Sequence, residues 1–173
     1  MAKNIKRRIV LTGMMGSGKT TIGKLLSEKI SFPFYDSDEE MELKLNLKIS
    51  EIFSKFGESR FRVEEEIVCK DLLNKDKYVI SLGGGAILNE KIFNIISEET
   101  TSIWLKTDEN ILIERLKEDK TRPLLNNKDL GKEIGKINNY RKQFYSKSDI
   151  CIENNDDDID QVVKKIIARI NKN

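Results

Sequence analysis

Residues 13–20, Gly-Met-Met-Gly-Ser-Gly-Lys-Thr, contain the residue types that bind a polyphosphate, and they match the pattern G-x-x-x-x-G-K-[ST] at every fixed position. Glycines in such a loop permit positive φ angles and let the backbone come close to a phosphate. Successive N–H groups can then point at the anion. Lys19 can reach the β- and γ-phosphates, and the Thr20 hydroxyl can ligate Mg²⁺. The alternative is a glycine-rich turn that merely begins a helix.

The sequence on either side of this loop favours phosphate binding over a simple turn. An apolar run at residues 9–11 predicts a buried strand, and apolar residues with helical spacing follow the loop from residue 22 to residue 30. Strand, glycine loop and helix in this order are the context that the motif requires. The helix would also present its positive N-terminal end to the anion. We therefore predict a nucleotide-phosphate site at residues 13–20.

Two aspartates, Asp36 and Asp38, follow the next predicted strand at residues 32–35. Strand side chains two positions apart point to the same side, and open α/β sheets bind ligands at the carboxyl ends of their strands. One carboxylate can hold Mg²⁺ through water, and the other can accept a proton or a hydrogen bond from a substrate hydroxyl. A pair of N-capping residues for the next helix explains them equally well, so both interpretations stay open.

Arg62 and Glu65 stand one turn apart in a predicted helix, and three consecutive glycines follow a predicted strand at residues 83–85. A solvated ion pair is the simple explanation for Arg62 and Glu65. The functional explanation is that Glu65 orients the planar Arg62 fork toward an anionic substrate. Three glycines exceed what one turn needs. They indicate that a ligand or another segment of the chain passes close to their backbone.

Further cations lie in the second half of the chain. Arg122 falls in a polar stretch, about residues 117–133, whose length is typical of a lid or binding loop. There it can neutralise charge on a transferring phosphoryl group, or it can be a solvated loop charge. Arg141 and Tyr145 share one face of a predicted helix, where a cation–π contact is the simple explanation. Arg115 is either a second cation at the base of the lid or a partner for nearby acids.

The order of the predicted elements indicates the fold class. Five predicted strands alternate with helices, which is typical of an α/β fold with a doubly wound parallel sheet. A helical block at about residues 37–74 interrupts the alternation, and we interpret it as a substrate-binding insertion. A chain of 173 residues suits one domain with a substantial core. The predicted strands are at about residues 6–12, 32–35, 78–82, 101–106 and 149–152.

The composition limits the classes of partner. The chain has 31 Lys+Arg against 29 Asp+Glu, a net charge of +2, which gives no electrostatic signature of nucleic-acid or membrane binding. There is no histidine, so a histidine-based triad or metal site is ruled out. Cys69 and Cys151 lack metal-ligand spacing and are expected to be small core or half-buried thiols. The N-terminus has no long apolar segment, and we expect a cytoplasmic protein.

The ordered combination of motifs is more specific than any of its members beyond the first. It comprises residues 13–20, Asp36-Ser37-Asp38, Gly57-Glu58 with Phe61-Arg62 and Glu65, the glycines 83–85, Arg122-Pro123-Leu124-Leu125, and Arg141 with Tyr145. With these motifs the chain resembles the shikimate kinase family from about residue 9 to residue 149.

That resemblance implies a P-loop NTPase fold of the nucleoside-monophosphate-kinase-like kind. The five-stranded parallel sheet would have the order 2-3-1-4-5, with helices on both faces, the helical insertion and a mobile lid, in one domain spanning residues 1–173. The implied reaction moves the γ-phosphoryl group of ATP to the 3-hydroxyl of shikimate, in the pathway to chorismate and the aromatic amino acids. The implied partners are ATP, one Mg²⁺ per subunit and shikimate, and a monomer is expected.

The resemblance also implies residue roles. Asp38 would hold the shikimate hydroxyls and act as the base, while Lys19 and Arg122 would supply positive charge at the transferring phosphoryl group. Thr20 and Asp36 would serve the metal. The residues implied for ATP are Gly16, Ser17, Gly18, Lys19, Thr20, Thr21 and Arg122. Those implied for shikimate are Asp38, Arg62, Arg141 and the backbone of Gly84, flanked by Gly83 and Gly85. No residue between positions 154 and 160 is assigned to the adenine.

Two other functions are compatible with the phosphate loop. One is another small-metabolite kinase of the same fold, acting on gluconate or a nucleoside monophosphate, although the set of Arg62, residues 83–85 and Arg141 argues against it. The other is a nucleotide-dependent switch without a small acceptor. A switch would bind ATP but would show no saturation with shikimate.

Overall fold

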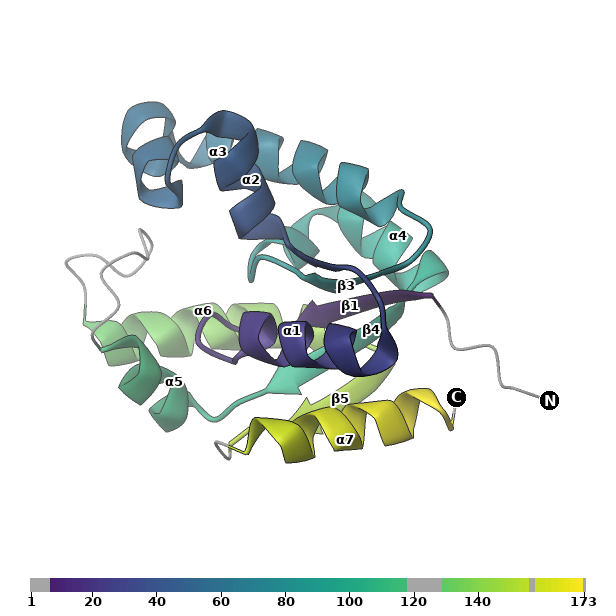
Figure 1. The fold of residues 1–173 in the computed structure, drawn as a ribbon. Helices are drawn as coiled ribbons and strands as arrows, with labels where there is room; N and C mark the ends of the chain where they lie inside the picture. The colour runs from purple at the N-terminus through teal and green to yellow at the C-terminus, as the bar shows by residue number, and fades with distance from the viewer. Residues whose placement is uncertain (1–6, 118–128, 156–157, 173) are drawn as a thin grey trace.

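A five-stranded parallel sheet forms the centre of the computed structural model, which describes residues 7–117, 129–155 and 158–172. The strand order is β2-β3-β1-β4-β5, and each adjacent pair is parallel, which confirms the predicted topology (Figure 1). Since β1 is the middle strand, the loop that follows it leaves from the centre of the sheet. The strands are β1 (Arg8–Thr12), β2 (Phe34–Asp36), β3 (Tyr78–Ser81), β4 (Thr101–Lys106) and β5 (Ile150–Glu153).

Helices cover both faces of the sheet, because the central strands are apolar on both sides. In β1, Ile9 and Leu11 pack into one hydrophobic cluster and Val10 packs into the other. The cluster on the side of Ile9 contains α1 (Lys19–Ile30) and α7 (Ile159–Ile170). The cluster on the side of Val10 contains α3 (Ile49–Leu73), α4 (Glu90–Glu99), α5 (Glu109–Leu116) and α6 (Leu130–Tyr145).

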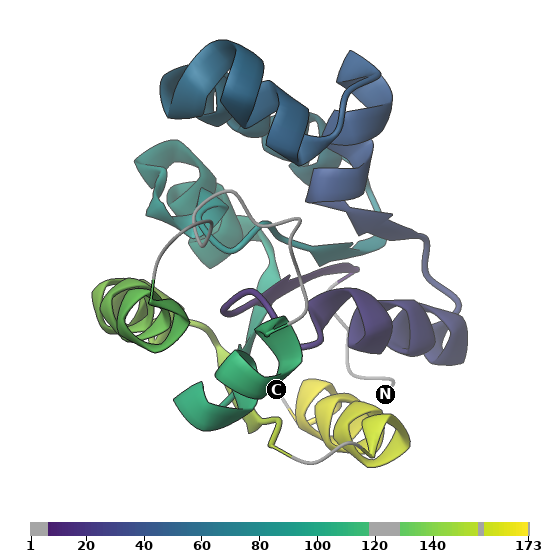
Figure 2. The ribbon, with the colours of Figure 1, turned by 90° about the vertical axis from the view of Figure 1, so that its left-hand side faces the viewer.

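The predicted helical block is built from α2 (Ser37–Leu45) and α3, which pack against each other on the side of the molecule away from α7 (Figures 1 and 2). Gly57 has a φ of 76° and a ψ of 174° inside α3. Only glycine adopts such angles without strain. The two halves of α3 therefore meet at a kink, and the second half carries Arg62 and Glu65.

The stretch predicted as a lid differs from its expected boundaries. The helix α6 begins at Leu130 rather than near residue 134, because Asp129 caps it by accepting the N–H of Lys132 at 3.2 Å. The last residues of the proposed lid, which we ended at residue 133, are therefore helical. Residues 118–128, including Arg122, lie outside the described residues.

The two cysteines also differ in their surroundings: Cys69 is buried, as predicted, whereas Cys151 is exposed on β5 and the prediction of a half-buried thiol was wrong there. Within the described ranges, no helix has the length and apolar character needed to cross a bilayer.

Candidate active site

The predicted phosphate loop joins the end of β1 to the first turn of α1. Gly16 and Gly18 have φ angles of 79° and 85°, in the left-handed region that favours glycine. Gly18 is also the N-cap of α1 and has no side chain to bond the first N–H groups of the helix. The start of a helix favours an anion, because its first N–H groups and the positive end of the helix dipole lie there.

The Lys19 side chain folds back over the loop. Its ammonium group donates to the carbonyl oxygens of Gly13 and Met14, both at 2.9 Å. The side chain is buried, so the charge is held at the loop and not extended into solvent. This places the cation where a bound phosphate would need it.

Asp36 joins the phosphate loop to the helical block, and the interpretation of this residue as an N-cap is confirmed. Its Oδ1 accepts the N–H groups of Asp38 at 3.0 Å and Glu39 at 3.3 Å, which caps α2. Its Oδ2 accepts the Thr20 hydroxyl at 2.6 Å. One buried carboxylate thus fixes the start of α2 and faces the residue predicted to ligate the metal.

Thr20 and Asp36 are suited to a Mg²⁺ ion that is also bound by substrate phosphates and water, and not to a metal ion bound by protein ligands alone. Among the described residues, no group of three or more acidic or thiol side chains could hold an ion. Mg²⁺ in nucleotide sites typically keeps several waters and takes one or two carboxylates plus substrate phosphates. The oxygen atoms of Thr20 and Asp36, beside the phosphate loop, match that requirement.

Asn154, to which the sequence analysis gave no role, and Arg115, for which it left two roles open, both support the phosphate loop. The buried Asn154 amide, just after β5, donates to the Ser17 carbonyl at 2.7 Å. Arg115, in the last turn of α5, donates to the Gly16 carbonyl at 3.2 Å. Both residues line a hollow that continues from the loop, together with Gly16, Gly18, Thr21, Ile22 and Ile159.

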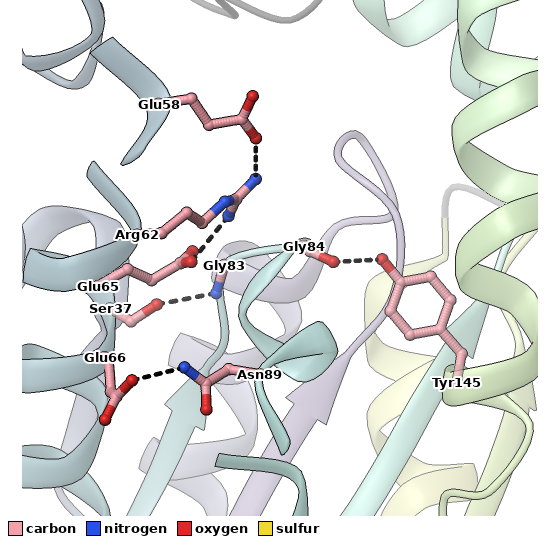
Figure 3. A network of polar contacts seen from close by, with 9 residues as sticks. All are labelled: Ser37, Glu58, Arg62, Glu65, Glu66, Gly83, Gly84, Asn89 and Tyr145. Atoms are coloured by element: carbon pink, nitrogen blue, oxygen red, sulfur yellow. Dashed lines mark hydrogen bonds and ion pairs between the residues drawn. The ribbon is translucent and has the colours of Figure 1, made fainter. Parts of the chain in front are cut away.

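A second cleft contains the predicted acceptor residues, and Figure 3 shows its arginine–glutamate pair. Arg62 donates to Glu65 at 2.7 Å and to Glu58 at 3.1 Å. Glu65 is only 4% exposed, so the pair is not a solvated surface interaction. Burial raises the pKa of Glu65 although Arg62 opposes the rise. Burial acts to lower the pKa of Arg62, but its two glutamates outweigh burial and raise it.

The three glycines at 83–85 each make room for a different charged side chain. A Cβ atom on Gly83 would lie 2.8 Å from Asp38 Oδ1, and one on Gly84 would lie 3.0 Å from Arg141 Nη1. One on Gly85 would lie 2.6 Å from Arg62 Nη1. The predicted close approach to this backbone is therefore real, and the approaching groups are those predicted for the acceptor.

Hydrogen bonds fix the direction of each peptide in this glycine loop (Figure 3). The Gly83 N–H donates to Ser37 Oγ at 2.8 Å, and its carbonyl accepts the Ala86 N–H at 3.0 Å. The Gly84 carbonyl accepts the Tyr145 hydroxyl at 2.6 Å. Within the part of the chain that the structure describes, the N–H groups of Gly84 and Gly85 meet no protein acceptor, so they are available to a ligand.

Tyr145 does not make the cation–π contact that was the simple explanation for its spacing from Arg141. Its side chain is 1% exposed, and among the described residues no cation–π contact joins it to Arg141. Burial raises the pKa of Tyr145 to about 12, while the neighbouring Arg141 acts in the opposite direction. Arg141 is itself 4% exposed and lines the acceptor cleft.

The phosphate cleft and the acceptor cleft meet at one place. Both are lined by Met15, Asp38, Gly83 and Gly84. Beyond that junction the acceptor cleft has apolar walls from Ile49, Phe53 and Phe61, and its charged residues are Arg62, Glu65 and Arg141. A small ring with a carboxylate would find an apolar wall and two cations here, with Asp38 toward the phosphates.

We expect Gly85→Ala to weaken acceptor binding without disturbing the fold. The backbone angles at Gly85, φ −96° and ψ −13°, are open to alanine, but the new methyl group would displace the Arg62 guanidinium. Loss of a charge-assisted hydrogen bond worth about 1.5–3 kcal/mol should raise the KM for the acceptor by about tenfold or more. Steady-state kinetics with varied acceptor would measure this.

The matched control is Gly135→Ala in α6, where the new Cβ would lie 3.6 Å from Glu109 Oε2, an ordinary contact. That variant should keep wild-type kinetics and gain about 0.5–1 kcal/mol of stability, since alanine suits a helix interior. An unchanged acceptor KM in Gly85→Ala would show that the present position of Arg62 is unimportant.

The fold and the two joined clefts define a P-loop phosphotransferase of the nucleoside-monophosphate-kinase-like class. A sequence model described as Shikimate kinase matches residues 15–171. The chain belongs to the shikimate kinase family.

Individual relatives and solved structures agree with this placement. A shikimate kinase of Thermodesulfovibrio yellowstonii is 40% identical over 93% of this chain and 93% of its own length. A structure of shikimate kinase from Acinetobacter baumannii in complex with shikimate superposes with a TM-score of 0.93 at 31% identity, covering 98% of this chain and 97% of that one. A gluconokinase from Sinorhizobium meliloti shares only the fold, with 13% identity and a TM-score of 0.61.

Proposed function

We propose that this chain transfers the γ-phosphoryl group of ATP to the 3-hydroxyl of shikimate, giving ADP and shikimate 3-phosphate. The observation that supports this most is the junction of the two clefts at Asp38 and the glycine loop. An acceptor whose carboxylate lies at Arg62 and Arg141 would have its far side toward Asp38 and the phosphates.

The phosphate loop would bind the nucleotide through its backbone N–H groups and Lys19. The hollow beside Arg115 and Asn154 continues from the loop and would receive the nucleoside. Thr20 and Asp36 would hold Mg²⁺, which would neutralise charge on the phosphates. Arg122 is proposed from the sequence as a further cation on the transferring group.

The acceptor would be positioned by charge and by backbone donors. Arg62 and Arg141 would bind the carboxylate, and the N–H groups of Gly84 and Gly85 would donate to the same end of the ring. Asp38 would accept the proton of the reacting hydroxyl. Phosphoryl transfer asks a protein mainly for positioning and charge neutralisation, and this arrangement provides both. We also propose that the enzyme acts as a cytoplasmic monomer.

A coupled ADP-release assay with Mg-ATP tests the proposal directly. Shikimate should give saturable ADP release, while gluconate and AMP should give rates near the background. Equal rates with the three compounds would contradict the assignment of shikimate. Calorimetry distinguishes a kinase from a nucleotide-dependent switch. A switch would bind ATP but would show no heat of binding with shikimate, in the presence or absence of nucleotide.

A further inference from the structure

We propose that Tyr145 is a positioning residue for the acceptor, acting through the Gly84 carbonyl and through Arg141. This inference rests on the proposed function, because it concerns how the acceptor cleft is prepared for its substrate. Tyr145 does not line that cleft. It stands behind the groups that do, so its effect must pass through them.

The tyrosine ring is fixed on several sides. It stacks on Trp104 of β4 with ring centroids 6.1 Å apart, and its hydroxyl lies 4.0 Å from Met14 Sδ in the phosphate loop. The side chain is 1% exposed. A ring held in this way presents its hydroxyl at one point, and there it donates to the Gly84 carbonyl at 2.6 Å.

This bond determines the direction of one peptide group in the glycine loop. In a trans peptide the carbonyl and the next N–H point in opposite directions, and the described chain has no cis peptide bond. Because the Gly84 carbonyl is held toward Tyr145, the Gly85 N–H points away from Tyr145. Glycine imposes little restriction on its own backbone, so this hydrogen bond supplies a constraint that the loop sequence lacks.

The hydroxyl also adjoins the second carboxylate-binding cation. Arg141 lies one helical turn before Tyr145, and its Nη1 would be 3.0 Å from a Cβ atom on Gly84. The same arginine acts on the pKa of Tyr145, which burial raises to about 12. The phenol therefore remains a proton donor across the neutral range. Tyr145 thus fixes the relation between Arg141 and the Gly84 peptide.

The test is Tyr145→Phe, which removes only the hydroxyl. We expect the shikimate KM to rise by about tenfold, as for a lost hydrogen bond that leaves a buried carbonyl unpaired. The KM for ATP should stay within about twofold, because the nucleotide is held by groups that this bond does not orient. Steady-state kinetics with each substrate varied, and calorimetric titration of shikimate, would measure both quantities.

The matched control is Tyr78→Phe. Tyr78 is also buried, also has a pKa raised to about 12 by burial, and donates to the Leu73 carbonyl at 3.3 Å. Tyr78 lines neither cleft. Tyr78→Phe should lower the melting temperature and leave both KM values unchanged. If the role of Tyr145 were merely structural, Tyr145→Phe would give the same result.

Two kinetic results would contradict a positioning role for Tyr145. An unchanged shikimate KM in Tyr145→Phe, or an equal rise of both KM values, would overturn the proposal. If Tyr145→Phe does not fold, 4-aminophenylalanine at position 145 restores a donor, and that variant must bind shikimate as the wild type does. Weak shikimate binding by that variant would also overturn it. Failure of the proposed function itself would appear differently, as a wild-type protein without shikimate-dependent ADP release.

Discussion

Lys19→Ala should lower kcat by about 10²–10³-fold, because it removes a fixed positive charge from the place where negative charge builds up on the transferring group. The Lys19 ammonium is already held at the phosphate loop by the Gly13 and Met14 carbonyls. The cation is therefore already at the loop before the nucleotide binds. The coupled ADP-release assay at saturating ATP and shikimate would measure the loss.

Lys24→Ala is the control for this variant. Lys24 lies in the same helix, half exposed, with its ammonium 3.4 Å from Glu39. Exposed pairs of this kind contribute about 0–1 kcal/mol to stability. The variant should therefore stay folded, and its kcat should stay near the wild-type value. Turnover within tenfold of wild type in Lys19→Ala, with an intact melting transition, would remove this residue from the chemistry.

Arg62→Ala should lower kcat/KM for shikimate by about 10²-fold or more, since truncating one member of a buried, hydrogen-bonded charge pair costs about 2–5 kcal/mol. The effect should fall on shikimate and leave the KM for ATP unchanged, because Arg62 lines the acceptor cleft and not the phosphate cleft. The melting temperature should also fall, because Glu65 would lose its partner at 2.7 Å. Kinetics below both melting transitions would separate the two effects.

Arg60→Ala provides the comparison on the same helix. Arg60 pairs with Glu64 at 2.6 Å, one turn along α3, but does not line the acceptor cleft. Both variants lose an arginine–glutamate pair, and only Arg62→Ala should lose shikimate affinity. The proposed carboxylate-binding role would be wrong if the two variants had the same kcat/KM for shikimate.

Local pattern was enough to predict the strands and the phosphate loop, whereas the strand order came from the family resemblance. Buried parallel strands appear as continuous apolar runs, and the fixed residues of the loop are close in sequence. The start of α6 was missed because its first turn, from Leu130, is polar and depends on the Asp129 cap. Apolar periodicity carries little information about such a turn.

Contacts between segments that are distant in the sequence could not be predicted from sequence patterns. Asn154 bonds Ser17 across 137 residues, and only the strand order places the end of β5 near the loop after β1. The sequence also did not show that the two oxygen atoms of Asp36 divide their contacts, one capping α2 and the other accepting the Thr20 hydroxyl. The hydrogen bond from Tyr145 to the Gly84 carbonyl could not be predicted either, because a shared helix face does not reveal which backbone carbonyl a hydroxyl meets.

The glycine loop has a consequence for drug resistance. An inhibitor that accepts hydrogen bonds from the N–H groups of Gly84 and Gly85 would contact main chain, which no substitution removes except proline. Any larger residue that blocked the compound would also displace Arg141 or Arg62, since a Cβ atom alone would come within 3.0 Å of one or 2.6 Å of the other. Escape from such a compound would therefore carry a fitness cost for the cell.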